Sequence, residues 1–397
     1  MVNYESLIGK VRLLNQLIDS KTMIVFDEVH RVKNPIGQRA AKALELGPQA
    51  SFHYVLTGTP IPNSYTDIYN FLHLLYKNEY DSYFGWEVNE LEAIDSEEVN
   101  DKLQPFFWRT NKQDLNVPVA DPDQLIEVQP NSTMLELASY IWNNEPGILA
   151  IYMRLLQAST NPAMLLKNLD ELDYHELGFI SEEVNQISAS EALDKAEAKQ
   201  ARQDYYRQIG VDKLISPKFT AGINLITKLV REGKKVMVWG MFVDTMKKIQ
   251  VALQDAGIRS NLVYGGTPKE DRVGLINSFR NKTGGIDIMI SNPATLGESI
   301  SLHREVHDAV YFEYNFNLTF MLQSRDRIHR LGLKPDDYTR YYYLQLNGEI
   351  ARDGFIDKRV YERLKQKEQV MLSAIDGDLL LPMIEDDFLD DVKRVIG

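Results

Sequence analysis

The second half of the chain alternates between short apolar runs and amphipathic helical stretches, and this alternation constrains the fold most. Four runs are typical of strands: "KVMVWGMF" (235–242), "NLVYGG" (261–266), "IDIMISN" (286–292) and "DAVYFEY" (308–314). Stretches with helical spacing of apolar residues lie between them, such as "VDTMKKIQVALQDAG" (243–257). Strands that alternate with helices imply a parallel sheet. We therefore predict an α/β domain over residues 205–350.

A shorter version of the same pattern occupies the first part of the chain. "TMIVF" (22–26) and "FHYVLTG" (52–58) are strand-like runs that end in polar or glycine residues. "SYTDIYNFLHLLY" (64–76) has helical spacing. Residues 1–130 are therefore predicted to form a first α/β unit, residues 131–204 a helical connector, and residues 351–397 a closing helix with an acidic, solvated tail.

Composition limits the class of protein. The 397 residues carry a formal net charge of −13, which argues against a generally basic nucleic-acid-coating protein but leaves room for a local basic groove. The absence of cysteine excludes disulfides and cysteine-ligated zinc. No apolar run approaches the roughly 20 residues that cross a bilayer, and the first residues lack the layout of a signal peptide. A cytoplasmic protein is predicted.

Two adjacent carboxylates, Asp27 and Glu28, follow the apolar run 22–26 directly. An unpaired buried carboxylate is very costly, so a core strand should end this way only where it emerges at the carboxyl edge of a parallel sheet. Ligands and metal ions bind at that edge. In nucleotide motors the Asp holds Mg²⁺ through water and the Glu polarises the attacking water. The alternative is a solvated surface turn, because short acidic strings are common.

Two further stretches carry polar groups in a suggestive order. Thr57, Gly58 and Thr59 follow the second strand-like run and offer hydroxyls and backbone donors, although a plain turn stopped by Pro60 is the alternative. In "QSRDRIHRLG" (323–332), the spacing predicts a helix with Gln323, Arg327 and Arg330 on one face. Such arginines can bind a phosphate chain, and a solvated surface helix is the alternative.

Taken in order, the motifs "DEVHRVKN", "LTGTPIPN", "LGESISL" and "QSRDRIHRLG" resemble those of superfamily 2 helicase-like ATPases. The nearest branch is the Swi/Snf-type DNA translocases, and the resemblance runs from residue 2 to about residue 370. It implies two RecA-like domains with ATP bound between them. It also implies a double-stranded DNA partner, which is held by its backbone phosphates.

The resemblance also implies roles for single residues. Asp27 would bind Mg²⁺ through water, Glu28 would be the catalytic base, and Arg327 and Arg330 would be arginine fingers. His30 and Gln323 would contact the nucleotide and couple the domains. The remaining candidates are the nucleotide-side Gly297 and Glu298 and the residues on the nucleic-acid side, Thr57, Gly58, Thr59 and Ser299.

Some features depart from the family. Pro62 and Leu333 stand where remodellers usually have Gln, which favours a relative from a bacterium or phage, in the cytoplasm of that cell or of the infected host. The phosphate-binding P-loop, G-x-x-x-x-G-K-[ST], does not occur. The front half of the first domain is therefore predicted to be missing, with a separate N-terminal half that carries the P-loop as a candidate partner, and the chain alone is predicted to be inactive. A non-hydrolysing interaction module and an RNA-directed member are the alternatives.

Overall fold

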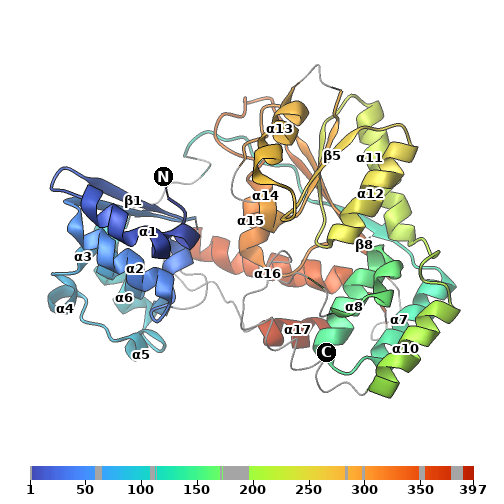
Figure 1. Cartoon of the computed structure of the whole chain (residues 1–397), viewed down its shortest axis with the longest axis horizontal. Coiled ribbons are helices and arrows are strands. Elements are labelled where there is room, and N and C mark those ends of the chain that lie inside the picture. Colours follow the sequence, from blue (N-terminus) through green and yellow to red (C-terminus); the bar gives the residue numbers. More distant parts are fainter. Residues whose placement is uncertain are drawn as a thin grey trace. The chain divides into compact units, whose positions relative to one another are not determined.

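The computed structural model describes residues 2–58, 65–107, 112, 114–169, 172, 196–281, 285–296, 300–347, 354–376 and 388–397 (Figure 1). The chain divides into two compact units. The first unit comprises Met1–Arg109 and Gln366–Asp386, and the second comprises Thr110–Lys365 and Asp387–Gly397. Each unit is described by itself.

The first unit contains two parallel strands, β1 (Met23–Asp27) and β2 (Phe52–Leu56), paired from Met23 opposite Phe52 to Asp27 opposite Leu56. Its longer helices are α1 (Tyr4–Leu17), α2 (Gln38–Leu46), α3 (Tyr69–Tyr76) and α6 (Ser96–Leu103). Short helices complete it: η1 (Val29–Val32), η2 (Gly47–Gln49), η3 (Tyr65–Ile68), α4 (Tyr80–Tyr83), α5 (Val88–Leu91) and η4 (Gln104–Phe106).

The core of the first unit lies on one face of this small sheet. Phe26 of β1 packs in a cluster with Leu7 of α1, Leu46 of α2 and Leu74 of α3. Alternation along each strand sends every second side chain to the other face. Among the described residues, no comparable cluster covers that other face, and its side chains are exposed.

The second unit is built on a six-stranded sheet with the order β3-β8-β7-β4-β6-β5, and all its pairs are parallel. Its strands are β3 (Gln124–Val128), β4 (Val236–Trp239), β5 (Ser260–Val263), β6 (Ile288–Ser291), β7 (Asp308–Tyr311) and β8 (Arg340–Leu346). The predicted α/β class with parallel strands is therefore confirmed, and all four strand-like runs of the second half form strands.

Helices cover both faces of this sheet. α11 (Pro217–Arg231) and α12 (Val243–Asp255) share a buried cluster with Val238 and Ile290 on one face. On the other face, Tyr311 shares a hydrogen bond with Ser324 of α15 (Leu318–Arg325). α13 (Lys269–Arg280) and α14 (Pro293–Leu296) lie between the strands in sequence. Every residue of β4, β6 and β7 is consequently buried.

The boundary between the units differs from the predicted residue 130. β3 pairs with β8 through five residues, so residues 124–128 belong to the sheet of the second unit. The helices of the predicted connector, α7 (Ser132–Asn144), α8 (Ile148–Thr160), η5 (Pro162–Leu166) and α10 (Ala196–Gln208), also belong to the second unit. α8 is buried from Leu149 to Thr160, which is the packing of a core helix.

A buried ion pair fixes the start of α16 (Asp357–Asp376) within the second unit. Lys218 at the start of α11 places its Nζ 2.8 Å from Oδ2 of Asp357 and 3.2 Å from Oγ of Ser159. The same Oδ2 accepts the backbone N–H of Leu346 at 2.8 Å. One carboxylate therefore joins the end of β8 to α8, α11 and α16.

The end of the chain is not a solvated tail throughout. α17 (Phe388–Ile396) buries Val392 and Val395, and its Asp391 accepts a hydrogen bond from buried Arg363 at 2.6 Å. The apolar spacing within residues 388–396 explains this packing, because it gives a short helix one apolar face. None of the described helices is long and apolar enough to cross a membrane.

Candidate functional site

The carboxyl ends of β1 and β2 bring together the residues that follow the two strands. Because Asp27 lies opposite Leu56 in the ladder, Glu28 and Thr57 leave the sheet at the same edge. The hydroxyl of Tyr4 donates to the backbone carbonyl of Asp27 at 2.9 Å and holds this strand end against α1. Burial and the nearby Asp27 carboxylate raise the pKa of Tyr4, which keeps its hydroxyl protonated as a donor.

Glu28 adopts a left-handed backbone conformation, with φ 50° and ψ 50°. Residues with a Cβ rarely take this conformation, and it costs about 1–3 kcal/mol. The turn is held in place by the residues after it, since Val29 and Val32 of η1 are fully buried. The bend lets the chain turn sharply at the sheet edge while the Glu28 side chain stays half-exposed.

His30 lies between the carboxylate and the hydroxyl at this edge. Its Nδ1 is 3.3 Å from Oε2 of Glu28 and 3.2 Å from Oγ1 of Thr57. A carboxylate at this distance favours the tautomer that carries its proton on Nδ1. His30 thus links the strand end of β1 to that of β2 and orients Glu28, an arrangement suited to a general base.

Asp27 fits a magnesium ion held through water. Its side chain lies at an exposed strand end, and its Oδ1 accepts the backbone N–H of Glu28 at 3.1 Å. Mg²⁺ keeps several of its waters and usually needs only one or two protein carboxylates. The described residues contain no group of three or more His, Cys, Asp or Glu side chains that could hold a metal directly.

The residues at the ends of β1 and β2 fit the triphosphate less well than they fit the metal ion. Holding the β- and γ-phosphates requires a lysine on a glycine-rich loop, and the 397 residues contain no G-x-x-x-x-G-K-[ST] motif. The edge of β1 and β2 thus offers a metal-binding carboxylate and an oriented base, without the lysine-bearing loop that holds the phosphates.

The spacing predicted one continuous helix for the arginine-rich segment of the second unit, and this prediction is wrong. α15 ends at Arg325, with Asp326 as its C-cap, and the chain continues in turns to Gly332. Arg327 and Arg330 therefore do not share a helical face with Gln323. Gly332, with φ 105°, is where the chain takes a conformation that favours glycine.

Arg327 and Arg330 hold the neighbouring loop. The guanidinium of Arg327, which is 9% exposed, donates to the carbonyls of Gln323 at 2.8 Å and Ile300 at 3.0 Å. Arg330, less buried, donates to the hydroxyl of Ser301 at 2.7 Å. Burial and these bonds contradict the solvated-helix alternative. Oε1 of Gln323 is buried and has no hydrogen-bond partner among the described residues.

A third arginine of this segment, Arg325, has a structural partner that sequence reasoning missed. Its guanidinium lies 3.2 Å from Oδ1 of Asp123 and stacks over the ring of Tyr341 at 4.3 Å. The hydroxyl of Tyr361 and Nζ of Lys365 approach Oδ2 of Asp123 at 2.9 and 3.4 Å. Nothing in the local sequence "VADPDQ" marks Asp123 as a hub, because its partners lie about 200 residues away.

Four predicted site residues lie outside the described part of the structure. These are Thr59, and the three residues that precede Ile300 in sequence, namely Gly297, Glu298 and Ser299. Gly58 is described, and a Cβ there would meet no atom within 4 Å.

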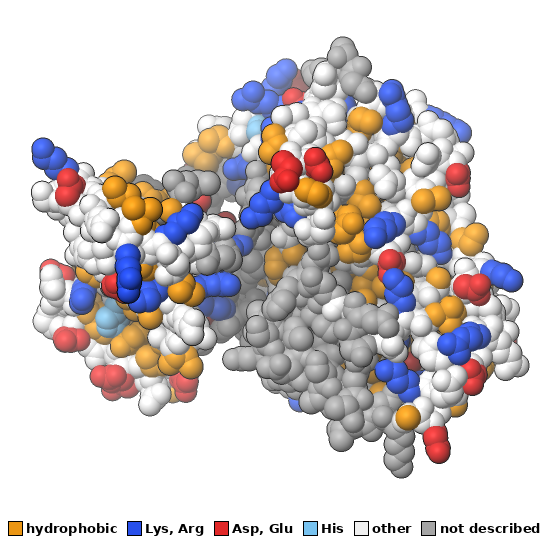
Figure 2. Space-filling view, in the orientation of Figure 1, with side chains coloured by type: hydrophobic (Ala, Val, Ile, Leu, Met, Phe, Trp, Pro, Cys, Tyr) orange, Lys and Arg blue, Asp and Glu red, His pale blue; other side chains and the backbone are white. Residues whose placement is uncertain are grey.

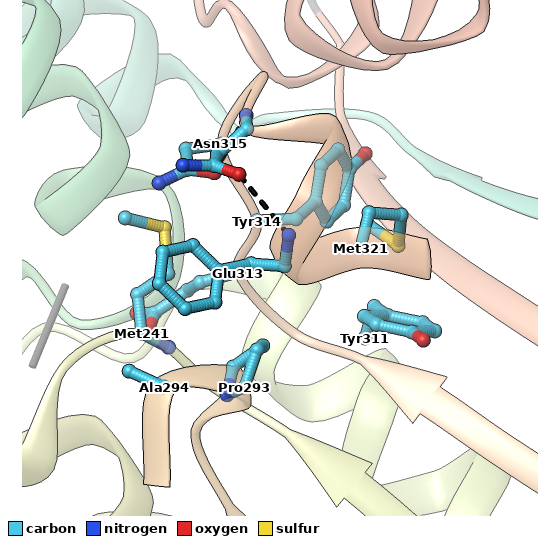
Figure 3. A pocket seen from close by; sticks show the side chains of 10 residues that line it. Met241, Pro293, Ala294, Tyr311, Glu313, Tyr314, Asn315 and Met321 are labelled. Carbon is cyan, nitrogen blue, oxygen red and sulfur yellow. Dashed lines mark hydrogen bonds between the residues drawn. The ribbon is translucent and has the colours of Figure 1, made fainter. Parts of the chain in front are cut away.

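A small hollow at the carboxyl ends of β4, β6 and β7 has a buried carboxylate in its wall (Figure 3). Its walls include Met241 after β4, Pro293 after β6, and Tyr311 and Tyr314 from β7 and the segment that follows it. Oε2 of Glu313 accepts the backbone N–H groups of Met241 and Phe242, both at 3.1 Å.

Glu313 therefore caps the start of α12 and ties it to the end of β7. Burial is the largest cause that raises the pKa of Glu313, to about 7. The two backbone N–H groups and the charge of Lys218 act in the opposite direction. This role could not be predicted from the sequence, since "YFEYN" is typical of a strand that continues into a turn.

Two family models match this chain. Residues 1–172 match the SNF2-related domain, and residues 218–332 match the helicase conserved C-terminal domain. The first match covers the first unit up to Arg109 and the start of the second unit, and the second match lies within the second unit.

Similar proteins include chromatin regulators. The "SWI/SNF-related matrix-associated actin-dependent regulator of chromatin subfamily A containing DEAD/H box 1 homolog" of Caenorhabditis elegans is 23% identical over 95% of this chain and 41% of its own length. The "SWI/SNF chromatin-remodeling complex subunit snf22" of Schizosaccharomyces pombe is 22% identical over 93% of this chain and 23% of its own length. The chain thus spans less than half the length of these relatives.

Among solved structures, the "Sulfolobus solfataricus SWI2/SNF2 ATPase core in complex with dsDNA" covers 99% of this chain and 76% of its own. The identity is 18% and the TM-score is 0.39.

Proposed function

We propose that this chain, which matches an SNF2-related domain and a helicase conserved C-terminal domain, is the core of a superfamily 2, Swi/Snf-type ATP-dependent DNA translocase. In this proposal the chain contributes the residues of the first domain that hold the metal ion and activate the attacking water. It also contributes the whole second domain. A phosphate-binding lysine comes from sequence outside residues 1–397, because phosphoryl transfer needs one and the P-loop motif is absent here. The observation that carries the proposal is the Asp27–Glu28–His30–Thr57 arrangement.

In this arrangement each residue has one task. The carboxylate of Asp27 would hold Mg²⁺ through water, and the ion, when bound, would compensate the charge of the phosphates. Glu28 accepts the proton of the attacking water. The imidazole of His30, 3.3 Å from Glu28 and 3.2 Å from Thr57, fixes the orientation of that carboxylate. Through its contact with His30, Thr57 would couple the position of Glu28 to the end of the adjacent strand, β2.

For the second unit, we propose Arg330 as an arginine finger. Among the described residues its guanidinium donates to one neutral acceptor, the Ser301 hydroxyl, which it can exchange for a phosphate. Arg327 would first have to release two backbone carbonyls, so it is better suited to positioning the 300–302 loop. The nucleotide-side roles of Gln323, Gly297 and Glu298 and the DNA-side roles of Gly58, Thr59 and Ser299 remain part of the proposal.

The partner that we propose is double-stranded DNA, held through its backbone phosphates. The net charge of −13 means that any such contact depends on a local basic surface and is not helped by the charge of the whole chain. Binding should then weaken steeply as salt rises, because phosphate contacts release counterions. A bacterial or phage origin and a cytoplasmic location remain predictions.

The test is ATP turnover by this chain joined to sequence that supplies the P-loop, with and without duplex DNA. Duplex DNA should stimulate turnover, and added salt should remove the stimulation. Glu28→Gln should abolish turnover and leave ATP binding intact, and Arg330→Ala should lower it by roughly 10³. Wild-type turnover by Glu28→Gln would refute the assignment of the base. Equal turnover with and without nucleic acid would refute the translocase.

A further inference from the structure

Three helices of the second unit enclose a small hollow whose walls carry buried charge. The helices are α7, α8 and α10, which lie near one another in Figure 1, and the rings of Tyr140 on α7 and Tyr205 on α10 stack with their centroids 3.5 Å apart. The polar residues that line the hollow are Glu145, Arg154, Lys199, Arg202, Gln203 and Tyr206. None of the nine described residues in its lining has a part in the proposed function.

The two arginines of the hollow are buried and share one carboxylate. Arg154 is 5% exposed and Arg202 is 7% exposed, and their Nε atoms lie 3.8 and 3.5 Å from the carboxylate of Glu145. The same carboxylate accepts the hydroxyl of Tyr206 at 2.7 Å, and burial and this carboxylate raise the pKa of Tyr206. Lys199, which is half-buried, brings a third positive charge. Buried charge is costly unless it is paired, so these walls favour a group that supplies further negative charge.

The excess of positive charge belongs to the hollow and not to the surface around it. Figure 2 shows Lys and Arg side chains mixed with Asp and Glu side chains where Figure 1 draws α7 and α10. Arg207 of α10 pairs with Asp204 at 3.0 Å, and both of these side chains are more than half exposed. An anion would therefore be held by the few groups that line the hollow, because a mixed surface exerts little attraction over a longer range.

Two buried hydrogen-bonding groups in the walls indicate a ligand. Among the described residues, Nε of Arg154 and Oε1 of Gln203 are buried without a hydrogen-bond partner. Native proteins leave few buried polar groups unpaired. Nη1 of Arg154 already donates to Oε1 of Gln157 at 3.0 Å and to the carbonyl of Lys167 at 2.9 Å. The guanidinium is thus fixed in one position while its Nε donor still lacks an acceptor.

The start of α8 adds to the positive potential of the hollow. Pro146 and Ala150, which lie on either side of the N-cap Gly147 in sequence, both line the hollow. Gly147 has no side chain that could accept the first N–H groups of the helix. The partial positive charge of this helix N-terminus therefore acts on the same hollow as the two arginines, and it favours an anion there.

We propose that this hollow binds the phosphate group of a small phosphomonoester. Three cations and one carboxylate in its lining leave two positive charges, and a phosphomonoester carries a charge of about −1.5 to −2 at pH 7. Guanidinium groups suit phosphate, because their planar donors match its oxygens. Nε of Arg154 donates to a phosphate oxygen, and Oε1 of Gln203 accepts a hydroxyl of the same ligand. The hollow encloses about 330 Å³ together with the open solvent at its mouth, so it suits one small group and not a large cofactor.

The test is calorimetric titration of the full chain with inorganic phosphate at constant ionic strength. Arg154→Gln should weaken phosphate binding by about tenfold or more, because it removes a charge-assisted hydrogen bond. Lys199→Gln should weaken it by about threefold, since this lysine is half-exposed. Arg207→Gln removes the same charge from an exposed position of α10 and is the matched control, with unchanged affinity. Glu145→Gln should strengthen binding by about threefold or more, because it removes the competing carboxylate and keeps an acceptor for Tyr206.

The gain in Glu145→Gln separates binding from folding, because damage to the helices would weaken binding in every variant. A wild-type chain that binds no phosphate would overturn the proposal, and so would equal losses in Lys199→Gln and Arg207→Gln. Acetate that binds as tightly as phosphate would also overturn it, since a single negative charge would then suffice. Phosphate binding that is lost in Arg330→Ala and kept in Arg154→Gln would place the anion at the proposed arginine finger and exclude the hollow.

Discussion

The two sheets of this chain use the same kind of strand in opposite surroundings. β4 of the second unit is buried along its whole length, whereas β1 of the first unit buries only Phe26. Both belong to parallel pairs, and β1 ends at Asp27 and is followed by Glu28, two residues to which the motifs assign a function. The difference shows that the Asp27–Glu28 pair stands at the end of the less supported sheet. The arginines of the second unit belong to the unit whose strands β4, β6 and β7 are buried on both faces.

The largest difference between the units is expected when the buried ion pair of the second unit, Lys218–Asp357, is removed. Lys218→Ala leaves the Asp357 carboxylate buried without its charged partner, and removing one partner of such a pair costs about 3–5 kcal/mol. Hydrogen exchange of the β4 and β6 amides should report this loss. Lys213→Ala, an exposed lysine just before α11, is the control and should change stability by less than about 0.5 kcal/mol. A loss below about 1 kcal/mol at Lys218 would mean that solvent reaches the pair.

A matched pair of valines tests the sheets themselves. Val238 of β4 is 0% exposed, and its replacement by Ala should lower the stability of the second unit by about 2–3 kcal/mol through lost burial and a cavity. Val25 of β1 is 45% exposed, and Val25→Ala should cost less than about 0.5 kcal/mol in the chain alone. Chemical denaturation of both variants gives the comparison. Equal losses would show that Val25 is buried in solution.

Glu313 gives the second unit a dependence on pH. Burial raises its pKa to about 7, above the value in the unfolded chain, so the folded state holds the proton to a higher pH. Between about pH 4.5 and 7 the folded state binds more protons, and stability therefore falls as pH rises through this window. Glu313→Gln keeps an acceptor for the N–H groups of Met241 and Phe242 and removes the charge.

The measurement is the free energy of unfolding at pH 5 and pH 8. The advantage of Glu313→Gln over the wild type should grow by roughly 1–3 kcal/mol between these values. Glu270→Gln, on the exposed side of α13, should show no such growth. A Glu313→Gln variant that is less stable than the wild type at pH 8 would show that the ionised carboxylate is the better cap.

Strands and motif positions could be predicted where the signal is local. The apolar runs at 235–242 and 286–292 became β4 and β6, and the strand end at Asp27 lies beside Thr57 as the sheet-edge argument required. The prediction of a helix through Arg330 is wrong. The spacing of the arginines indicates a helical face, but their side chains instead bind the carbonyl of Ile300 and the hydroxyl of Ser301.

Long-range partners could not be predicted at all. β3 was assigned to the first unit because it lies near it in sequence, yet its ladder partner β8 is more than 200 residues away. Asp123 and Lys218 have ordinary local surroundings, and their burial depends on Tyr361 and Asp357 from the far end of the chain. A single sequence carries no periodicity that reports such pairs.

The smallest effect, and the sharpest test of the first unit, concerns backbone strain at Glu28. Glycine takes the left-handed conformation without penalty, but it loses more entropy on folding, so Glu28→Gly should stabilise the first unit by about 0.5 kcal/mol. Glu28→Gln keeps the strain and should leave stability unchanged.

Asn116→Gly is the matched control in the second unit. Asn116 also has a positive φ, 55°, but asparagine already tolerates it, and its gain should be near zero. Thermal denaturation of the three variants measures the differences. A loss of more than about 1 kcal/mol for Glu28→Gly would mean that the contact of Glu28 with His30 outweighs the strain, and that the strand end is held by its side chains rather than by the buried valines of η1.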